Sequence, residues 1–223
     1  MTQGMHQDPT FTRARSRLYD LLATVFDGDV ETLERALREG AFVELAAGLP
    51  ADLDTDALRR DDLDAEALGV GYDNLFDVPG PHYVPPFASA HATDPSEAFE
   101  SDSSYHSAGE AGELFGDPAH SVAEWYARAD FEPERGDGIP DHVAAEFGFM
   151  AALTSAEAAI LESEDAGDVA GLREVQREML DHLAWIEPFA ASVAEKDGSE
   201  RVFAALSEFA RAVVAWDADQ LDA

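Results

Sequence analysis

Residues 140–162, PDHVAAEFGFMAALTSAEAAILE, decide the fold class of this chain. A proline and a carboxylate stand at the beginning, and both suit the first turn of a helix. The large apolar residues that follow are spaced like one buried helical face: Val143, Phe147, Met150, Leu153 and Ile160. The stretch therefore predicts a long buried helix that begins at Pro140 or Asp141.

Most of the remaining chain repeats this helical spacing, and strand-like alternation is absent. We predict further helices over residues 11–26, 29–39, 42–47, 55–76, 104–115, 121–129, 168–186 and 199–216. Gly40 suits a helix stop, whereas Gly69 and Gly71 weaken the 55–76 helix and Pro188 should kink or restart the chain. The expected fold is all-α, with residues 1–223 forming a single helical-bundle domain of about 8–10 helices.

Charge is the strongest feature of the composition. Among 223 residues there are 47 Asp and Glu but only 14 Lys and Arg, which gives a formal net charge of −33. Because the acids are spread along the whole chain, they favour a solvated surface adapted to high salt, where the Debye length falls to about 3 Å at 1 M. An acidic surface for a basic partner would give the same composition. Either way, nucleic-acid binding is disfavoured, since it requires clustered cations.

Several classes of protein are disfavoured by what the sequence lacks. The chain has no cysteine, which excludes disulfides, thiolate zinc sites and cysteine-ligated clusters. We see no run of 18 apolar residues and no secretory signal, so we expect a cytoplasmic protein without a membrane span. Motifs of nucleophilic, nucleotide-binding and zinc-protease sites are missing, so we expect no catalytic residues, no cofactor and no metal.

Residues 77–103 interrupt the helical pattern. Their first part, DVPGPHYVPPFASAHATDP, contains five prolines, which predict an ordered extended loop between N- and C-terminal helical halves. One interpretation is a rigid connector. The other is the lip of a peptide-binding groove, with aromatic surface from Tyr72, Phe76, Tyr83 and Phe87.

Two pairs of residues allow an enzymatic alternative. His142 and Glu146 are four residues apart on one predicted helix, as are Glu178 and His182, and such pairs can ligate a metal. The alternative is a helical metal-dependent hydrolase or oxygenase that uses His142, Glu146 and His182. Neither pair has the spacing of three residues found in the Glu-x-x-His motifs of carboxylate-bridged di-iron bundles.

Three stretches, in order, resemble the TorD/DmsD/NarJ family of redox-enzyme maturation chaperones over roughly residues 65–215. The first has Tyr72-x-x-Leu75-Phe76, then Pro79-Gly80, Pro85-Pro86 and Ser89, with His91 where an aromatic residue is common. The second is Pro140-Asp141-His142-Val143-x-x-Glu146-Phe147-x-Phe149-Met150. The third is Leu180-x-His182-Leu183-x-Trp185-Ile186-x-Pro188-Phe189. The N-terminal segment shares only its helical character.

This resemblance implies a cytoplasmic chaperone that is not an enzyme. Its partner would be the apo catalytic subunit of a molybdopterin oxidoreductase, of the dimethyl sulfoxide, trimethylamine N-oxide or nitrate reductase type, and the twin-arginine leader of that subunit. The chain would hold the subunit back from export and assist cofactor insertion, as a monomer or homodimer. Its composition would make it an acidic, haloarchaeal-type member. A permanent helical scaffold subunit of a reductase complex is a further alternative.

The chemistry of such a leader predicts the binding residues. Two arginines followed by an apolar helix-forming stretch need carboxylates beside an apolar groove. We expect Asp141, Glu146 or a neighbouring acid to face the arginines, although Asp141 would also suit a helix cap. The apolar part would be shaped by Tyr72, Leu75, Phe76 and Trp185, with Trp185 serving first as a core residue. The other candidate peptide-binding residues are Pro79, Gly80, Pro86, Ser89 and His142.

Overall fold

The computed structural model describes residues 8–92, 116–163, 167–198 and 201–222. These ranges are mainly helical and contain no strand, which confirms the all-α prediction. Extended pairing within them consists of an isolated antiparallel bridge between Phe87 and His142. The predicted 104–115 helix lies outside the described residues.

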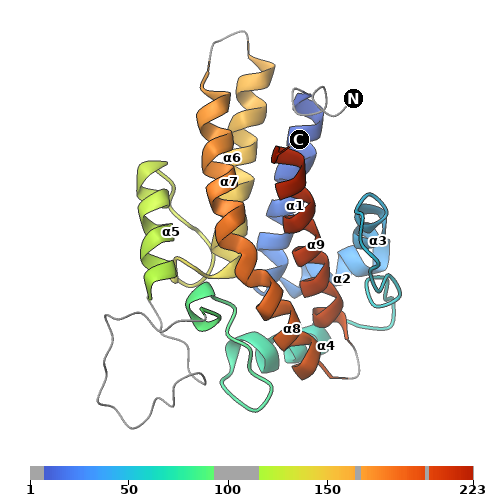
Figure 1. Cartoon of the computed structure of the whole chain (residues 1–223). Coiled ribbons are helices and arrows are strands. Elements are labelled where there is room, and N and C mark those ends of the chain that lie inside the picture. The colour runs from blue at the N-terminus through green and yellow to red at the C-terminus, as the bar shows by residue number, and fades with distance from the viewer. Residues whose placement is uncertain (1–7, 93–115, 164–166, 199–200, 223) are drawn as a thin grey trace, which may run out of the picture.

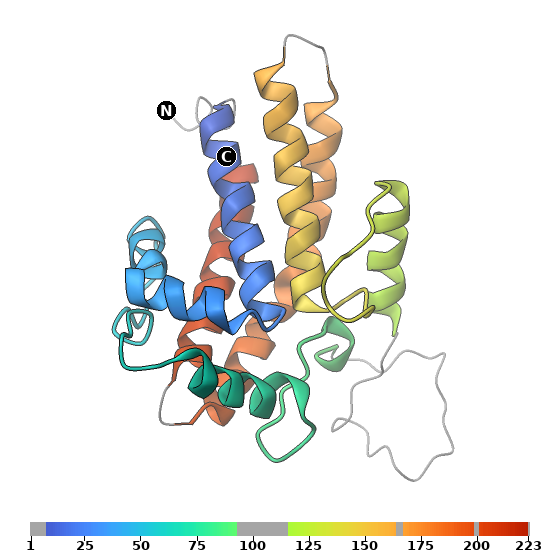
Figure 2. The ribbon, with the colours of Figure 1, turned by 180° about the vertical axis from the view of Figure 1, so that it is seen from behind.

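The longest helices form the centre of the molecule: α1 (Pro9–Phe26), α6 (Val143–Glu162), α7 (Val169–His182) and α9 (Val202–Asp222). α1 packs along α6, α7 lies beside α6, and α9 packs against α7 and α8 (Ile186–Lys196) (Figures 1 and 2). α1 begins and α9 ends at the same end of the bundle, whereas the segment 78–92 lies at the opposite end (Figure 1).

Shorter helices flank this centre. α2 (Val30–Glu39) and α3 (Ala41–Ala46) lie on the side of α1 and α9, and α5 (Asp117–Arg128) lies on the side of α6 and α7 (Figure 2). α4 (Ala65–Tyr72) continues into a π-helical turn, Asp73–Asp77. Two 3-10 turns, Ala88–Ala90 and Leu183–Trp185, complete the described helical elements.

Several predicted boundaries are wrong, among them the start of the 121–129 helix, which begins at Asp117, and the end of the 199–216 helix, which continues to Asp222. The 55–76 helix begins only at Ala65, because the Asp64 side chain caps it by accepting a hydrogen bond from the Ala67 N–H. The helix predicted over 168–186 ends at His182, and the restart expected near Pro188 does occur, at Ile186. Pro188 lies in the first turn of α8, where a proline interrupts no helical hydrogen bond. The long buried helix begins at Val143, and not at Pro140 or Asp141.

Acidic residues begin four of the described helices. At α1, α2, α4 and α7 the residue before the helix is an aspartate whose carboxylate accepts a backbone N–H of the first turn: Asp8, Asp29, Asp64 and Asp168. Each cap stabilises its helix by about 1 kcal/mol. Some of the many acidic residues therefore stabilise the backbone as helix caps.

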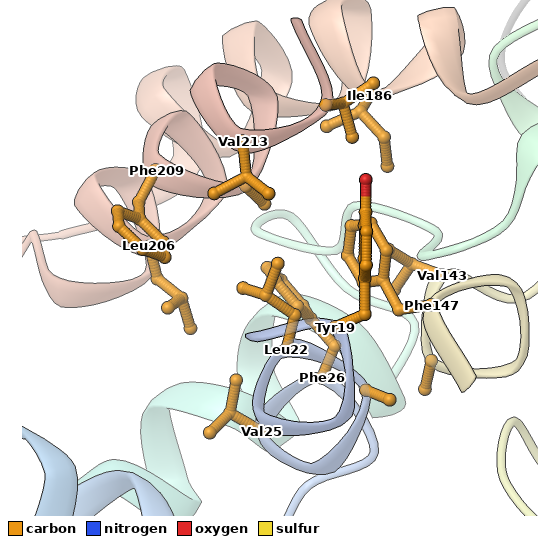
Figure 3. Packing of buried hydrophobic residues seen from close by; sticks show 14 of the residues in the cluster. Tyr19, Leu22, Val25, Phe26, Val143, Phe147, Ile186, Leu206, Phe209 and Val213 are labelled. Carbon is orange, nitrogen blue, oxygen red and sulfur yellow. The ribbon is translucent and has the colours of Figure 1, made fainter. Parts of the chain in front are cut away.

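The hydrophobic core joins the helices that the spacing predicted. In Figure 3, side chains of α1, α6, α8 and α9 converge, with the rings of Tyr19, Phe26 and Phe147 among them. α6 is buried on almost every face of its first three turns. It is also the one helix of the described ranges that is long and apolar enough to cross a membrane, and 61% of that window is buried, as in the core helix of a soluble protein.

A buried polar network crosses this core. Arg15 of α1 forms two hydrogen bonds with the Asp217 carboxylate of α9, at 2.6 and 2.8 Å, and a third with Gln176 of α7 at 2.8 Å. The Tyr19 hydroxyl donates to Asp217 at 2.7 Å, and Glu157 of α6 accepts from Gln176 at 2.9 Å. Since each polar group has a partner, the network fixes how these four helices align.

Candidate functional site

The proline-containing segment crosses the beginning of α6, and their backbones are hydrogen-bonded. The Ala88 N–H donates to the Asp141 carbonyl at 2.9 Å, and the Val143 N–H donates to the Pro86 carbonyl at 2.8 Å. These bonds flank the bridge between Phe87 and His142. Two stretches that sequence reasoning singled out separately thus form one structural unit.

The Asp141 side chain strengthens this junction. Its Oδ2 atom accepts hydrogen bonds from the backbone N–H of Ser89 at 2.7 Å and from the Ser89 hydroxyl at 2.6 Å. Asp141 is fully buried, yet its Oδ1 atom has no hydrogen-bond partner among the described residues. A buried acceptor left without a donor costs about 1–3 kcal/mol. Asp141 therefore combines an anchoring oxygen with an unsatisfied one.

His142, and not Asp141, caps α6. Its Nδ1 atom accepts a hydrogen bond from the Ala144 N–H at 3.1 Å. Burial lowers the pKa of His142 to about 4, although the charge of Asp137 opposes this shift. The imidazole is therefore neutral at pH 7 and keeps the lone pair that the cap requires.

Glu146 lies one turn into α6 and is completely buried. Its Oε1 atom is 2.6 Å from Nε2 of His182, and its Oε2 atom accepts a hydrogen bond from the indole N–H of Trp185 at 2.8 Å. Burial raises the pKa of Glu146, and the charge of Asp141 adds to that effect while His182 and Trp185 oppose it. Burial alone would lower the pKa of His182, but the Glu146 carboxylate raises it above its ordinary value. Glu146 and His182 therefore form a close polar pair that links α6 to the end of α7.

An aromatic layer lies beside these polar groups. His91 stacks on Trp185 with ring centroids 5.5 Å apart, and Phe189 meets both rings edge-on. The ring of His91 also bonds through Nε2 to the Pro85 carbonyl at 2.9 Å, and burial lowers the pKa of His91. His91 thus occupies the place of an aromatic side chain, as its position in the family pattern suggested.

The apolar candidate residues continue this layer. Phe76 packs against Phe189 at 5.8 Å between ring centroids, and Tyr72 packs edge-on against Phe76 at 5.3 Å. Leu75 and Phe76 are buried, and Tyr72 is half-buried, with its hydroxyl bonded to the Phe26 carbonyl at 2.8 Å. Pro79 and Gly80 lie apart from this layer, on the exposed turn of the 78–92 segment.

The structure thus brings Ser89, Asp141, Glu146 and Trp185 together, but it closes the crevice that we expected between them. All four residues are buried, and Glu146 is not on the solvent-facing surface. The segment of residues 84–91 is hydrogen-bonded over this place, so the chain's own residues cover the Asp141 carboxylate.

The three residues of the enzymatic alternative do not form a metal site. Glu146 and His182 do contact each other, but His142 is occupied with capping α6. Throughout the described ranges no group of three histidine, aspartate or glutamate side chains is placed to hold a metal ion.

Sequence reasoning missed two functions in this part of the molecule. It considered His182 as a metal ligand and as part of the third family stretch, whereas the structure pairs His182 with the Glu146 carboxylate and packs its ring edge-on against Trp125. It also overlooked Arg15, although Arg15, Leu18, Leu22 and Phe26 share one face of the first helix. A cation on a predicted core face signals a buried carboxylate partner elsewhere in the chain.

Comparisons with curated proteins and with solved structures give no significant match to the chain. A family model described as the nitrate reductase delta subunit matches residues 27–191. The match contains all three stretches that suggested the resemblance, and it begins earlier in the chain than that resemblance did. The chain belongs to the nitrate reductase delta subunit family, whose members are soluble cytoplasmic chaperones that act with the catalytic subunits of molybdoenzymes during their maturation.

Proposed function

We propose that this chaperone binds the twin-arginine leader and the apo form of a molybdopterin oxidoreductase catalytic subunit, of the dimethyl sulfoxide, trimethylamine N-oxide or nitrate reductase type. It keeps that subunit in the cytoplasm until the cofactor is inserted, and it catalyses no reaction of its own. Membership of the delta subunit family supports the general role. The leader-binding part rests on the junction between the 84–91 segment and α6.

The unsatisfied Oδ1 atom of Asp141 carries the proposal. A buried carboxylate oxygen without a donor is an acceptor for a cation that the chain itself does not supply. Arginine suits it well, because a guanidinium presents several donors in one plane and forms charge-assisted hydrogen bonds with carboxylates. Glu146 lies nearby and adds negative charge. After burial, the charges of Glu146 and Asp141 both raise the pKa of Tyr126, and the charge of Asp141 also raises the pKa of Glu146.

Access requires the 84–91 segment to lift from α6. The segment is held by the hydrogen bonds of Pro86, Ala88 and Ser89, and its departure would uncover both carboxylates together with Trp185. The apolar part of the leader would then lie on the rings exposed by this movement, Trp185 and Phe189 first. The guanidinium replaces the donors that Ser89 withdraws, so Asp141 remains paired in both states.

A calorimetric double-mutant cycle tests this assignment. The peptides are a twin-arginine leader of a molybdopterin oxidoreductase and the same peptide with both arginines replaced by glutamine. The protein variant is Asp141→Asn, which retains an acceptor for Ser89 but removes the charge. We expect Asp141→Asn to weaken binding of the arginine peptide by roughly tenfold or more, and to change binding of the glutamine peptide little.

Two outcomes would contradict the assignment. Equal losses for the two peptides would mean that Asp141 acts only by holding the fold, and unchanged binding of the arginine peptide would place the leader elsewhere. Ser89→Ala is the matched control, since it weakens the closed segment without removing a charge. It should leave the preference for arginine over glutamine intact.

A further inference from the structure

The Asp141 carboxylate depends on the 84–91 segment for its side-chain partners. Its Oδ2 atom accepts from the backbone N–H of Ser89 at 2.7 Å and from the Ser89 hydroxyl at 2.6 Å, and its Oδ1 atom has no partner among the described residues. Departure of the segment, which the proposed leader binding requires, leaves both oxygens without a donor. The two oxygens of one carboxylate match two parallel N–H groups of one guanidinium. Asp141 in the open state therefore has room for one arginine.

The second buried carboxylate, Glu146, keeps its partners in the same movement. Its Oε1 atom lies 2.6 Å from Nε2 of His182, and its Oε2 atom accepts from the indole N–H of Trp185 at 2.8 Å. Neither partner belongs to the 84–91 segment, so departure of the segment leaves both contacts in place. An arginine would have to displace His182 or Trp185 in order to pair with Glu146, and the displaced group would lose its buried hydrogen bond.

Ring packing also holds His182 and Trp185 independently of the segment. The His182 ring packs edge-on against Trp125 of α5, with ring centroids 5.4 Å apart, and the Trp185 ring packs against Phe189 of α8 at 5.5 Å. The ring of His91, which is stacked on Trp185, would leave with the segment. Opening therefore exposes a face of the indole for an apolar side chain, while the indole N–H stays bound to its carboxylate.

We propose that the site reads a single arginine of the leader, held by Asp141, and that Glu146 contacts neither arginine. This inference rests on the proposed function, and it narrows the expectation that Asp141, Glu146 or a neighbouring acid faces the arginines. The other arginine stays in solvent, where molar salt screens its attraction to the acidic surface. The specificity of the site is then for one guanidinium beside an apolar stretch, and a leader with one arginine is sufficient for binding.

Four leader peptides test the proposal with the full-length protein. They carry both arginines, the first alone, the second alone or neither, with glutamine at each replaced position. Calorimetric titration in molar KCl measures their affinities while exposed charges are screened. We expect at least one of the two single-arginine peptides to bind within about threefold of the twin-arginine peptide. The peptide without arginine should bind roughly tenfold or more weakly, because Asp141 then gains no charged partner.

The variant Glu146→Gln separates the roles of the two carboxylates. Glutamine keeps an acceptor for the Trp185 indole and an amide group that can bond to His182, but it removes the charge. We expect this variant to rank the four peptides as the wild type does. Glu178→Gln is the matched control, because it removes the same charge from the exposed surface of α7. A melting temperature measured for each variant shows whether the bundle is intact.

Two results would overturn the single-arginine reading. Roughly tenfold losses for both single-arginine peptides would mean that each arginine has its own partner. A twin-arginine peptide that binds Glu146→Gln, but not Glu178→Gln, roughly tenfold more weakly than the wild type would assign an arginine to Glu146. If Glu146→Gln does not fold, the four peptides with the wild type still decide. Failure of the proposed leader site gives a different pattern, because all four peptides would then bind the wild type alike.

Discussion

His142 is a buried base that the fold requires to be neutral. Its Nδ1 lone pair caps α6, and burial lowers its pKa to about 4. In the unfolded chain the imidazole takes up a proton near its ordinary value of 6.5. Between these two values the unfolded state binds more protons than the folded state. The contribution of His142 to the free energy of unfolding is therefore present above about pH 6.5, and it is lost as the pH falls toward about 4.

Replacement of His142 by asparagine should remove this acid sensitivity. Asparagine also caps helices but does not titrate. We expect the loss of unfolding free energy between about pH 7 and about pH 4.5 to be smaller by about 2–3 kcal/mol in His142→Asn than in the wild type. Urea unfolding of both proteins at the two pH values, at constant salt, measures this difference. The same acid loss in both proteins would show that His142 is not responsible.

The assignment of the α6 cap shows what local sequence signals cannot decide. Asp141 and His142 both precede the helix, and aspartate is the better capping residue in general. Ser89 is 52 residues away in the chain, yet it provides the donors that draw the Asp141 carboxylate away from the helix. The sequence singled out Ser89 and Asp141 separately, but it could not show that the distant Ser89 would compete with the nearby helix for the Asp141 carboxylate.

Helix alignment depends on the carboxylate of Asp217. It accepts hydrogen bonds from Arg15 and Tyr19 of α1, both inside the bundle. Removal of one partner of a buried ion pair leaves the other charge with less compensation in a low-dielectric core, and for Arg15 the Glu157 carboxylate at 3.5 Å would remain. This is costlier than the loss of any exposed pair.

We expect Asp217→Asn to lower the free energy of unfolding by about 3–5 kcal/mol, since Arg15 stays buried and charged. Denaturant unfolding in high salt measures this change. Arg38→Gln is the matched control, because Arg38 pairs with Glu34 on the exposed side of α2. It should change stability little. A similar, small effect of both substitutions would mean that the network does not hold the helices together.

Helices with local boundary signals were predicted well, and those shaped by distant contacts were not. α2 matches its prediction, because Asp29 and Gly40 mark its two ends and Gly40 adopts the left-handed conformation, with φ of 74°. For α4, Gly71 indicated only a weak helix. In the structure a Cβ atom at Gly71 would lie 2.9 Å from the ring of Phe203, so the glycine lets α9 approach closely. That requirement comes from a residue far along the chain.

At the scale of the whole molecule, the net charge of −33 makes stability dependent on salt. The carboxylates are distributed, and those not engaged in caps or ion pairs repel one another. The Debye length falls from about 10 Å at 0.1 M salt to about 3 Å at 1 M, which screens this repulsion. We propose that the acidity is an adaptation to a cytoplasm of high salt.

Thermal unfolding tests this adaptation directly. We expect the melting temperature to rise by roughly 6–12 °C between about 0.1 M and about 2 M KCl, which corresponds to about 3 kcal/mol for a chain of this size. A helical protein of similar length and near-zero net charge, measured in parallel, provides the control. If both proteins respond alike to KCl, screening of the carboxylates is not the cause.

The whole fold was more predictable than the state of the site. Helical spacing was sufficient for the all-α class, because each helix needs an apolar face toward the core. The sequence also named Ser89, Asp141, Glu146 and Trp185 as candidates for one site, and the structure brings these residues together. It could not show that these residues are covered, since coverage depends on how the 84–91 segment settles on α6 through backbone hydrogen bonds. Such bonds join backbone atoms, which differ little from residue to residue, so they leave no recognisable pattern in the amino-acid sequence.

The start of α1 and the end of α9 lie at one end of the bundle, and the segment that covers Asp141 lies at the opposite end (Figure 1). A sensor chip, bead or fluorescent reporter attached through either terminus would accordingly stand away from an arriving client. Immobilisation by a terminal tag thus suits kinetic tests of the proposed leader binding, and fusion to a reporter at either end should leave the proposed opening of the 84–91 segment unhindered.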